Sequence, residues 1–236
     1  MTINAYNFPV WPRSLEVPEV EKHKDFLIQR TQAAHRTEPK LVARSLARGA
    51  LFWQRWLVEK DPENNGEQRF VVSLELARDA GDWKEAELLL AHCESTRNGA
   101  DPLMQQWRDT IRNRLPQQVE NEQRLEIAFQ RFRNAQTMND DTARIELARE
   151  LMARAKAIGE VGSPVAVNNL LARISASVGW NEEAETYYTA LVVCRPLWIP
   201  YIVQLSEHQA KNDIKRAFQT LETAKALLGK DFWLVT

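Results

Sequence analysis

Glycine, cysteine and long apolar runs are scarce in this sequence, and each scarcity disfavours a class of protein. Glycine accounts for only 8 of the 236 residues, which is typical of a helical protein and disfavours a sheet with many tight turns. We interpret the 2 cysteines, Cys93 and Cys194, as buried thiols in a reducing compartment rather than as a disulfide. No run approaches the roughly 18 apolar residues that a membrane-spanning helix needs.

An excess of charge of either sign is also missing. Lysine and arginine number 31 against 32 aspartates and glutamates. A nucleic-acid-binding protein normally carries a basic excess or stripe, so this balance disfavours that role. The N-terminus lacks the charged start and the continuous apolar core of a signal peptide. We therefore expect a soluble, cytoplasmic protein.

Sequence motifs that carry catalysis or bind metals are absent as well. The four histidines are scattered, and neither His-Glu-x-x-His nor a Cys-x-x-Cys pair occurs. His92 and Cys93 are adjacent, which on a helix directs them about 100° apart and does not form a nucleophile and base pair. There is no glycine-rich phosphate loop and no Gly-x-Ser-x-Gly elbow. We predict no enzymatic activity, no metal site and no cofactor.

The clearest pattern that is present lies between Asn168 and Pro196 and predicts two short antiparallel helices. Apolar residues recur there at three- and four-residue steps up to Gly179. Glycine adopts the left-handed conformation past a helix C-terminus without a side-chain clash, so the first helix should end at that residue. A second apolar stripe includes Ala184 and Tyr188 and ends before the proline.

The turn of this hairpin recurs in the chain. Residues 81–87 match residues 179–185 at the first, fifth, sixth and seventh positions, and the offset of 98 residues is close to three units of about 33 to 34. A weaker copy begins at Asn212. These motifs resemble the tetratricopeptide repeat, a 34-residue helix-turn-helix. The resemblance implies that Ala184 lies at the close helix crossing, Tyr188 at the aromatic position and Pro196 at the closing proline.

The predicted fold class is therefore all-α. We expect a right-handed superhelical solenoid of antiparallel helix pairs, tetratricopeptide-like, with irregular N-terminal helices. Residues 1–18 are expected to form an extended arm rich in proline and aromatic residues, residues 19–66 N-terminal helices and a loop, and residues 67–236 the repeats with an apolar C-terminal tail. Pro116 should end a helix that starts near residue 102, and residues 119–158 should form a longer hairpin whose register stays open.

A stack of helix pairs offers a concave surface, formed by the first helix of each pair, that binds peptides. Asn and Arg side chains there are similar to those with which tetratricopeptide domains bind a peptide's terminal carboxylate. We expect a mixed polar groove; polar residues that are merely solvated are the alternative. The family register implies the following inward positions: Glu75, Arg78, Asp79, Asn169, Arg173, Ile202, Ser206 and Gln209.

Both ends of the chain carry large apolar side chains. Trp11 lies among prolines that favour an extended segment, and Phe232 and Trp233 follow the last predicted helix. Terminal repeats need a polar outer face, so these residues should be covered. They either fold back onto the chain or insert into a partner protein or a second copy of the chain.

The sequence thus predicts a protein that acts by binding. Our first hypothesis is a protein-protein interaction scaffold, adaptor or assembly chaperone that binds a protein or peptide, alone or as a subunit of a larger bacterial-type complex. The alternative is a nucleic-acid-binding or regulatory helical-repeat protein. It would use Lys40, Arg44 and Arg48, which share one helix face at four-residue spacing, although such a row is more often a solvated surface.

Overall fold

A computed structural model describes residues 11–61, 66–96, 102–135, 141–158 and 162–229, and within these residues the only regular secondary structure is helical, without strands. The prediction of an all-α chain is confirmed. The helices are α1 (Val17–Thr37), α2 (Lys40–Lys60), α3 (Gly66–Ala80), α4 (Trp83–Thr96), α5 (Pro102–Ala135), α6 (Asp141–Ile158), α7 (Pro164–Ser177), α8 (Asn181–Cys194), α9 (Ile199–Ala210) and α10 (Ile214–Leu228).

Two of the turns between paired helices share one glycine-dependent geometry. Gly81 has φ = 64° and Gly179 has φ = 79°, the left-handed region that favours glycine. In each turn the residue after the glycine donates its backbone N–H to a carbonyl five residues earlier: Asp82 to Ala77 and Trp180 to Ser175, both at 2.9 Å. This bond closes the helix end. The two turns that match in sequence therefore also match in structure.

Helix α2 lies at the centre of the molecule. It packs against its sequence neighbours α1 and α3 and also against the distant helices α7 and α8. Gly49 allows the closest approach, because a Cβ atom built on it would lie 2.5 Å from the carbonyl oxygen of Val193 on α8. Packing is thus not restricted to consecutive helices, and it crosses the predicted boundary at residue 66.

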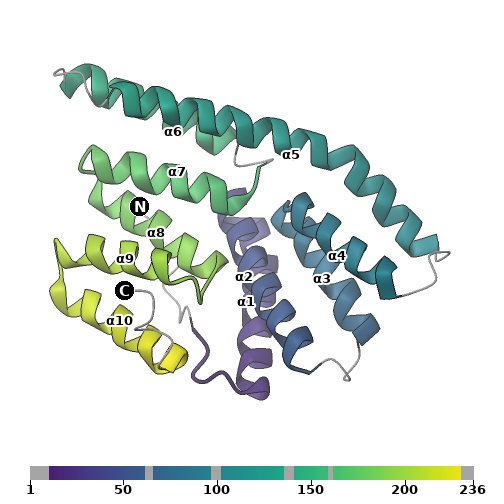
Figure 1. Cartoon of the computed structure of the whole chain (residues 1–236). Helices are drawn as coiled ribbons and strands as arrows, with labels where there is room; N and C mark the ends of the chain where they lie inside the picture. Colours follow the sequence, from purple (N-terminus) through teal and green to yellow (C-terminus); the bar gives the residue numbers. More distant parts are fainter. Residues whose placement is uncertain (1–10, 62–65, 97–101, 136–140, 159–161, 230–236) are drawn as a thin grey trace.

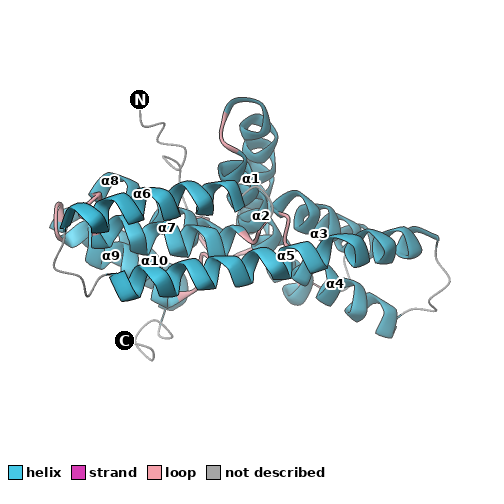
Figure 2. Ribbon diagram, turned by 90° about the horizontal axis from the view of Figure 1, so that it is seen from above, coloured by secondary structure: helices cyan, strands magenta, loops and turns pink. Residues whose placement is uncertain are grey.

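The buried apolar side chains form three clusters. The first joins α1 to α4 with the start of α5 and with Ala190 and Val193 of α8. The second fills the space between the end of α5, α6 and α7, and the third lies among α7 to α10. Figures 1 and 2 show α3 and α4 at one end of the molecule and α7 to α10 at the other, with α5 running past both.

The prediction that Pro116 ends a helix is wrong, because this proline lies inside α5, a continuous helix of 34 residues. Residues on both sides of the proline are held by packing: Trp107 and Ile111 in the first cluster, Leu125 and Phe132 in the second. Tertiary contacts thus outweigh the local cost of the missing N–H.

Gln118, two residues after Pro116, ties α5 to the start of α4. Its side-chain oxygen accepts the backbone N–H groups of Trp83 at 2.6 Å and Lys84 at 3.1 Å. These N–H groups have no partner inside α4, since they belong to its first turn. The contact fixes the middle of α5 against the first cluster.

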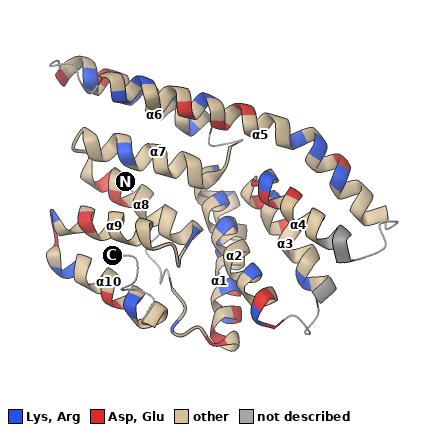
Figure 3. Ribbon diagram, in the orientation of Figure 1, with Lys and Arg blue, Asp and Glu red and all other residues tan. Residues whose placement is uncertain are grey.

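The helices of the described residues lack the combination of length and hydropathy that crossing a bilayer requires. Lysine and arginine alternate with aspartate and glutamate along the helices instead of gathering on one face (Figure 3).

Candidate binding groove between α5 and α7

The second half of α5 and the helix α7 enclose an open groove of about 340 Å³. Helical spacing explains which residues reach it, because residues three, four and seven apart share one face of a helix. The lining residues are Glu122, Leu125, Glu126, Phe129, Gln130 and Arg133 on α5 and Ala166, Asn169, Leu170 and Arg173 on α7.

Apolar side chains form the floor of this groove. Leu125 and Leu170 are buried in the second cluster, and Phe129 packs against that cluster while part of its side chain stays accessible. The groove is therefore anchored on a packed core and does not depend on loops.

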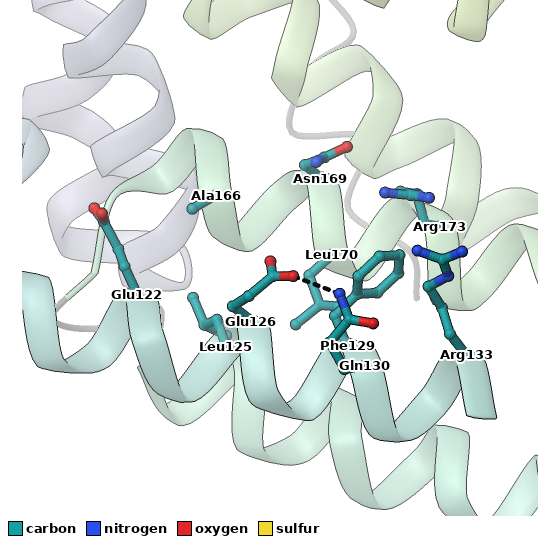
Figure 4. A pocket seen from close by; sticks show the side chains of 10 residues that line it. All are labelled: Glu122, Leu125, Glu126, Phe129, Gln130, Arg133, Ala166, Asn169, Leu170 and Arg173. Carbon is teal, nitrogen blue, oxygen red and sulfur yellow. Dashed lines mark hydrogen bonds between the residues drawn. The ribbon is translucent and has the colours of Figure 1, made fainter. Parts of the chain in front are cut away.

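Two arginines lie at one end of the groove. The guanidinium of Arg173 lies over the ring of Phe129, 4.2 Å from its centre, a cation–π contact that orients the side chain. Arg133 projects from α5 one helical turn after the phenylalanine. Figure 4 shows the two guanidinium groups beside each other, away from Glu122. Among the described residues neither arginine has a carboxylate partner.

Both acidic side chains of the groove already have partners, Glu122 at the other end and Glu126 in the middle. Glu122 forms an ion pair with Lys84 and accepts a hydrogen bond from Gln118 at 2.7 Å. Glu126 accepts the side-chain N–H of Gln130 at 2.8 Å, the dashed line in Figure 4. The groove is thus polarised, with available positive charge only at the Arg133 and Arg173 end.

Of the predicted inward residues, the structure brings Asn169 and Arg173 together in this groove. Glu75 and Arg78 are exposed on α3, which belongs to the first cluster, and the guanidinium of Arg78 pairs with its neighbour Asp79 at 3.1 Å. They do not line the groove.

The prediction for α9 is wrong. Ile202 is fully buried in the third cluster, and Ser206 and Gln209 are also buried. The side chain of Gln209 donates to Glu185 at 3.0 Å and accepts from Thr220 at 2.8 Å. Because α9 packs against both α8 and α10, the face expected to line a groove is an interface between helices.

Of the predicted terminal anchors, the structure describes only Trp11, which follows the fold-back alternative. Trp11 packs against the third cluster of its own chain, so it is not free as an anchor for a partner. Phe232 and Trp233 lie outside the described residues.

Two of the three residues in the predicted basic row of Lys40, Arg44 and Arg48 are buried and do not lie on the protein surface. Arg44 is buried, and its Nε donates to the carbonyl of Ala80 at 2.9 Å while its Nη2 contacts the carbonyl of Gly162. Arg48 is buried too: its Nε lies 2.9 Å from Asp82 and its Nη2 lies 3.5 Å from Glu85. Only Lys40, in the first turn, is exposed. The interpretation of this row as a nucleic-acid contact or a solvated face is therefore wrong.

Sequence analysis missed Phe129 and Arg133. Their i, i+4 spacing after Leu125 was visible, but the register of the segment 119–158 was open, so nothing indicated that this face meets α7. Within the described residues, no group of three or more His, Cys, Asp or Glu side chains is placed to hold a metal ion.

Comparison with known proteins adds no relative: no family model, no curated protein and no solved structure matches this chain.

Proposed function

We propose that this protein acts by binding, as an interaction scaffold, adaptor or assembly chaperone that holds a peptide segment of a partner protein in the groove between α5 and α7. The observation that carries the proposal is the pair Arg133 and Arg173, which has no carboxylate partner among the described residues and lies beside the ring of Phe129. An arginine pair at an open groove suits a carboxylate, which accepts two parallel N–H bonds from one guanidinium.

The dimensions of the groove fit an extended peptide. Glu122 and Arg133 are 11 residues apart on α5, which at about 1.5 Å per residue is about 16 Å. An extended chain rises about 3.3 Å per residue, so about five residues fit. The carboxylate, from an acidic side chain or a C-terminus, would lie at the arginine end, an apolar side chain over Phe129, and the amide of Asn169 would bond to the peptide backbone.

Helices α7 to α10 suit a tetratricopeptide-like scaffold, and we propose that they form two such repeats of a solenoid. The supporting observations are the left-handed turn at Gly179, the complete burial of Ala184 and the consecutive packing of α7, α8, α9 and α10. In such a scaffold the helix surfaces that remain uncovered serve recognition.

The nucleic-acid alternative loses two of its three residues, because Arg44 and Arg48 are enclosed by protein. Phosphate groups could still contact Arg133 and Arg173. However, binding that depends on phosphates falls steeply with salt and needs many cationic contacts. Two arginines within a balanced charge pattern favour recognition of a peptide carboxylate.

Charge reversal in the groove tests the proposal. The bait proteins are the wild type, the double variant Arg133→Glu with Arg173→Glu, and a matched control, Arg131→Glu, which reverses an exposed charge at a position that does not line the groove. Each is used for affinity capture and mass spectrometry, and peptides tiled over any captured protein are then titrated. We expect the wild type and the control to bind the same acidic peptide, and the double variant to bind it at least about tenfold more weakly.

Circular dichroism melting of all three proteins establishes that the variants fold. Equal binding of the peptide by the folded double variant would overturn the proposal. Capture of nucleic acid with a steep salt dependence, lost in the double variant, would instead favour the alternative.

A further inference from the structure

A second open pocket lies beside the central helix, and we define it as the α2 trough. One wall is formed by α2, from Arg48 to Glu59, and the opposite wall by the segment that joins α8 to α9, with Leu197 and Trp198. The trough has a volume of about 340 Å³ and shares no lining residue with the groove between α5 and α7.

Aromatic rings line the middle of the trough. Phe52 and Trp56 pack against the first core cluster and both meet Trp53 edge to face, at centroid distances of 5.1 and 6.5 Å. Trp198 faces them from the opposite wall with 50% of its surface exposed. A half-exposed indole beside supported rings is the arrangement found at the energetic centres of protein interfaces.

The position of Arg195 along α2 follows from the contacts at the end of α8. The Sγ of Cys194 lies 3.6 Å from the carbonyl oxygen of Ser45, and the carbonyl of Val193 lies against Gly49. The chain therefore leaves α8 beside residues 45–49, which places Arg195 at the Arg48 end of the trough. Glu59 lies at the other end, 11 residues after Arg48, or about 16 Å along the helix.

Three of the charges that line the trough pair with one another, and one charge at each end remains available. Arg48 and Arg55 both pair with Glu85 from α4. Arg195 and Glu59 line the trough without an ion-pair partner in the described part of the chain. Lys60 is not a lining residue, and its ammonium lies 6.0 Å from the Trp56 ring centre. The trough thus presents a positive end, an aromatic middle and a negative end.

We propose that the α2 trough binds an extended peptide segment of a partner protein at a site separate from the groove between α5 and α7. The segment has about five residues, from the length of the trough and the rise of an extended chain. An acidic residue pairs with Arg195, an aromatic or branched aliphatic side chain lies between Trp56 and Trp198, and a basic residue pairs with Glu59. A single small zwitterion could not reach both charged ends.

Selection from a displayed library of random peptides of about seven residues tests this site. The target is the full chain, and the folded Trp198→Ala variant serves for counter-selection. We expect enriched peptides to contain one large apolar residue with an acidic residue on one side and a basic residue on the other. Binding of a synthesised peptide to Trp198→Ala should weaken at least about tenfold.

A double-mutant cycle tests whether the acidic residue of the peptide pairs with Arg195. Arg195→Gln should weaken the selected peptide several-fold but should not change the binding of the same peptide with its acid replaced by glutamine. Glu59→Gln and the basic residue of the peptide form the second cycle. The double variant Arg133→Glu with Arg173→Glu should bind these peptides like the wild type, so failure of one site is distinguishable from failure of the other.

Two outcomes overturn the proposal. In the first, no peptide is enriched, or every enriched peptide binds Trp198→Ala as well as it binds the wild type. In the second, the selected peptides show no preference for an acidic residue, or Arg195→Gln leaves that preference unchanged. Trp198-dependent self-association in analytical ultracentrifugation, without peptide enrichment, would assign the trough to a second copy of the chain and would also overturn it.

Discussion

The molecule contains two pairs of arginines with different surroundings: Arg44 and Arg48 on α2, and Arg133 and Arg173 at the groove. The first two are buried, and backbone carbonyls or carboxylates of α3, α4 and the segment before α7 accept their hydrogen bonds. The second two line an open groove without carboxylate partners in the described residues. A buried guanidinium is tolerated only when its own chain supplies the acceptors, whereas an accessible one can take acceptors from a ligand.

This difference separates two roles within one chain. The arginines of α2 hold the junction between the first cluster and the helices that follow, so their loss should change stability. The arginines of the groove should change binding with little effect on stability. The variants below test that separation in order of decreasing effect.

Replacing Arg48 should have the largest effect. Arg48→Met keeps the length of the side chain but leaves the charge of Asp82 unpaired in a buried site and removes one of the two arginine partners of Glu85, which keeps Arg55. We expect the free energy of unfolding, measured by urea denaturation, to fall by about 3 to 5 kcal/mol. Arg131→Met, on an exposed position of α5, is the control and should change it by less than about 0.5 kcal/mol. Equal effects of the two substitutions would refute a structural role for Arg48.

Gly49→Ala tests the contact that brings α8 to the central helix. In an exposed helix this change stabilises by about 1 kcal/mol. Here the new Cβ would lie 2.5 Å from the carbonyl oxygen of Val193, so the two helices must separate. We expect a loss of about 1 to 3 kcal/mol in the free energy of unfolding. A rise in the melting temperature would show that α2 and α8 pack less closely than described.

The buried thiol of Cys194, at the contact between α8 and α2, should make the free energy of unfolding depend on pH. Burial raises the pKa of its thiol from 9.0 to about 12. The unfolded chain therefore loses this proton at a lower pH than the folded chain, so the free energy of unfolding should fall as the pH rises from about 9 towards 12. Burial also raises the pKa values of Tyr188 and Tyr201, which adds to the fall above about pH 10.

Cys194→Ala isolates the contribution of that thiol. Between pH 8 and pH 10 the wild type should lose about 1 kcal/mol more stability than the variant. Cys93 is present in both proteins, so its ionisation cancels in the difference. Parallel stability curves in urea denaturation would contradict the inaccessibility of Cys194.

Arg173→Ala should have the smallest effect on stability. The substitution removes a cation–π contact at an exposed side chain, worth about 0.5 to 1 kcal/mol. We expect a melting temperature close to that of the wild type together with weaker binding of the acidic peptide. A loss of stability as large as that of Arg48→Met would remove the distinction between the two arginine pairs.

Local patterns predicted the helices better than they predicted the faces. The turns at Gly81 and Gly179 were predictable, because a position with left-handed backbone conformation favours glycine, and glycine is visible in the sequence. The burial of Ile202 was assigned to the wrong side, because a helix covered by α8 and α10 shows the same periodicity as one that faces a groove. Asn169 was placed correctly, whereas Phe129 and Arg133 were missed because the register of residues 119–158 was open.

The amino-acid sequence by itself determined that the chain is helical, where its best hairpin turns, and that it carries no recognisable motif for catalysis or metal binding. Only the tertiary structure decided that α2 is central, that Pro116 lies inside a continuous helix and which arginines are enclosed. The reason is physical: turns and helical periodicity depend on neighbours within a few residues, whereas burial of a charge depends on segments that are 34 to 118 residues away in the chain.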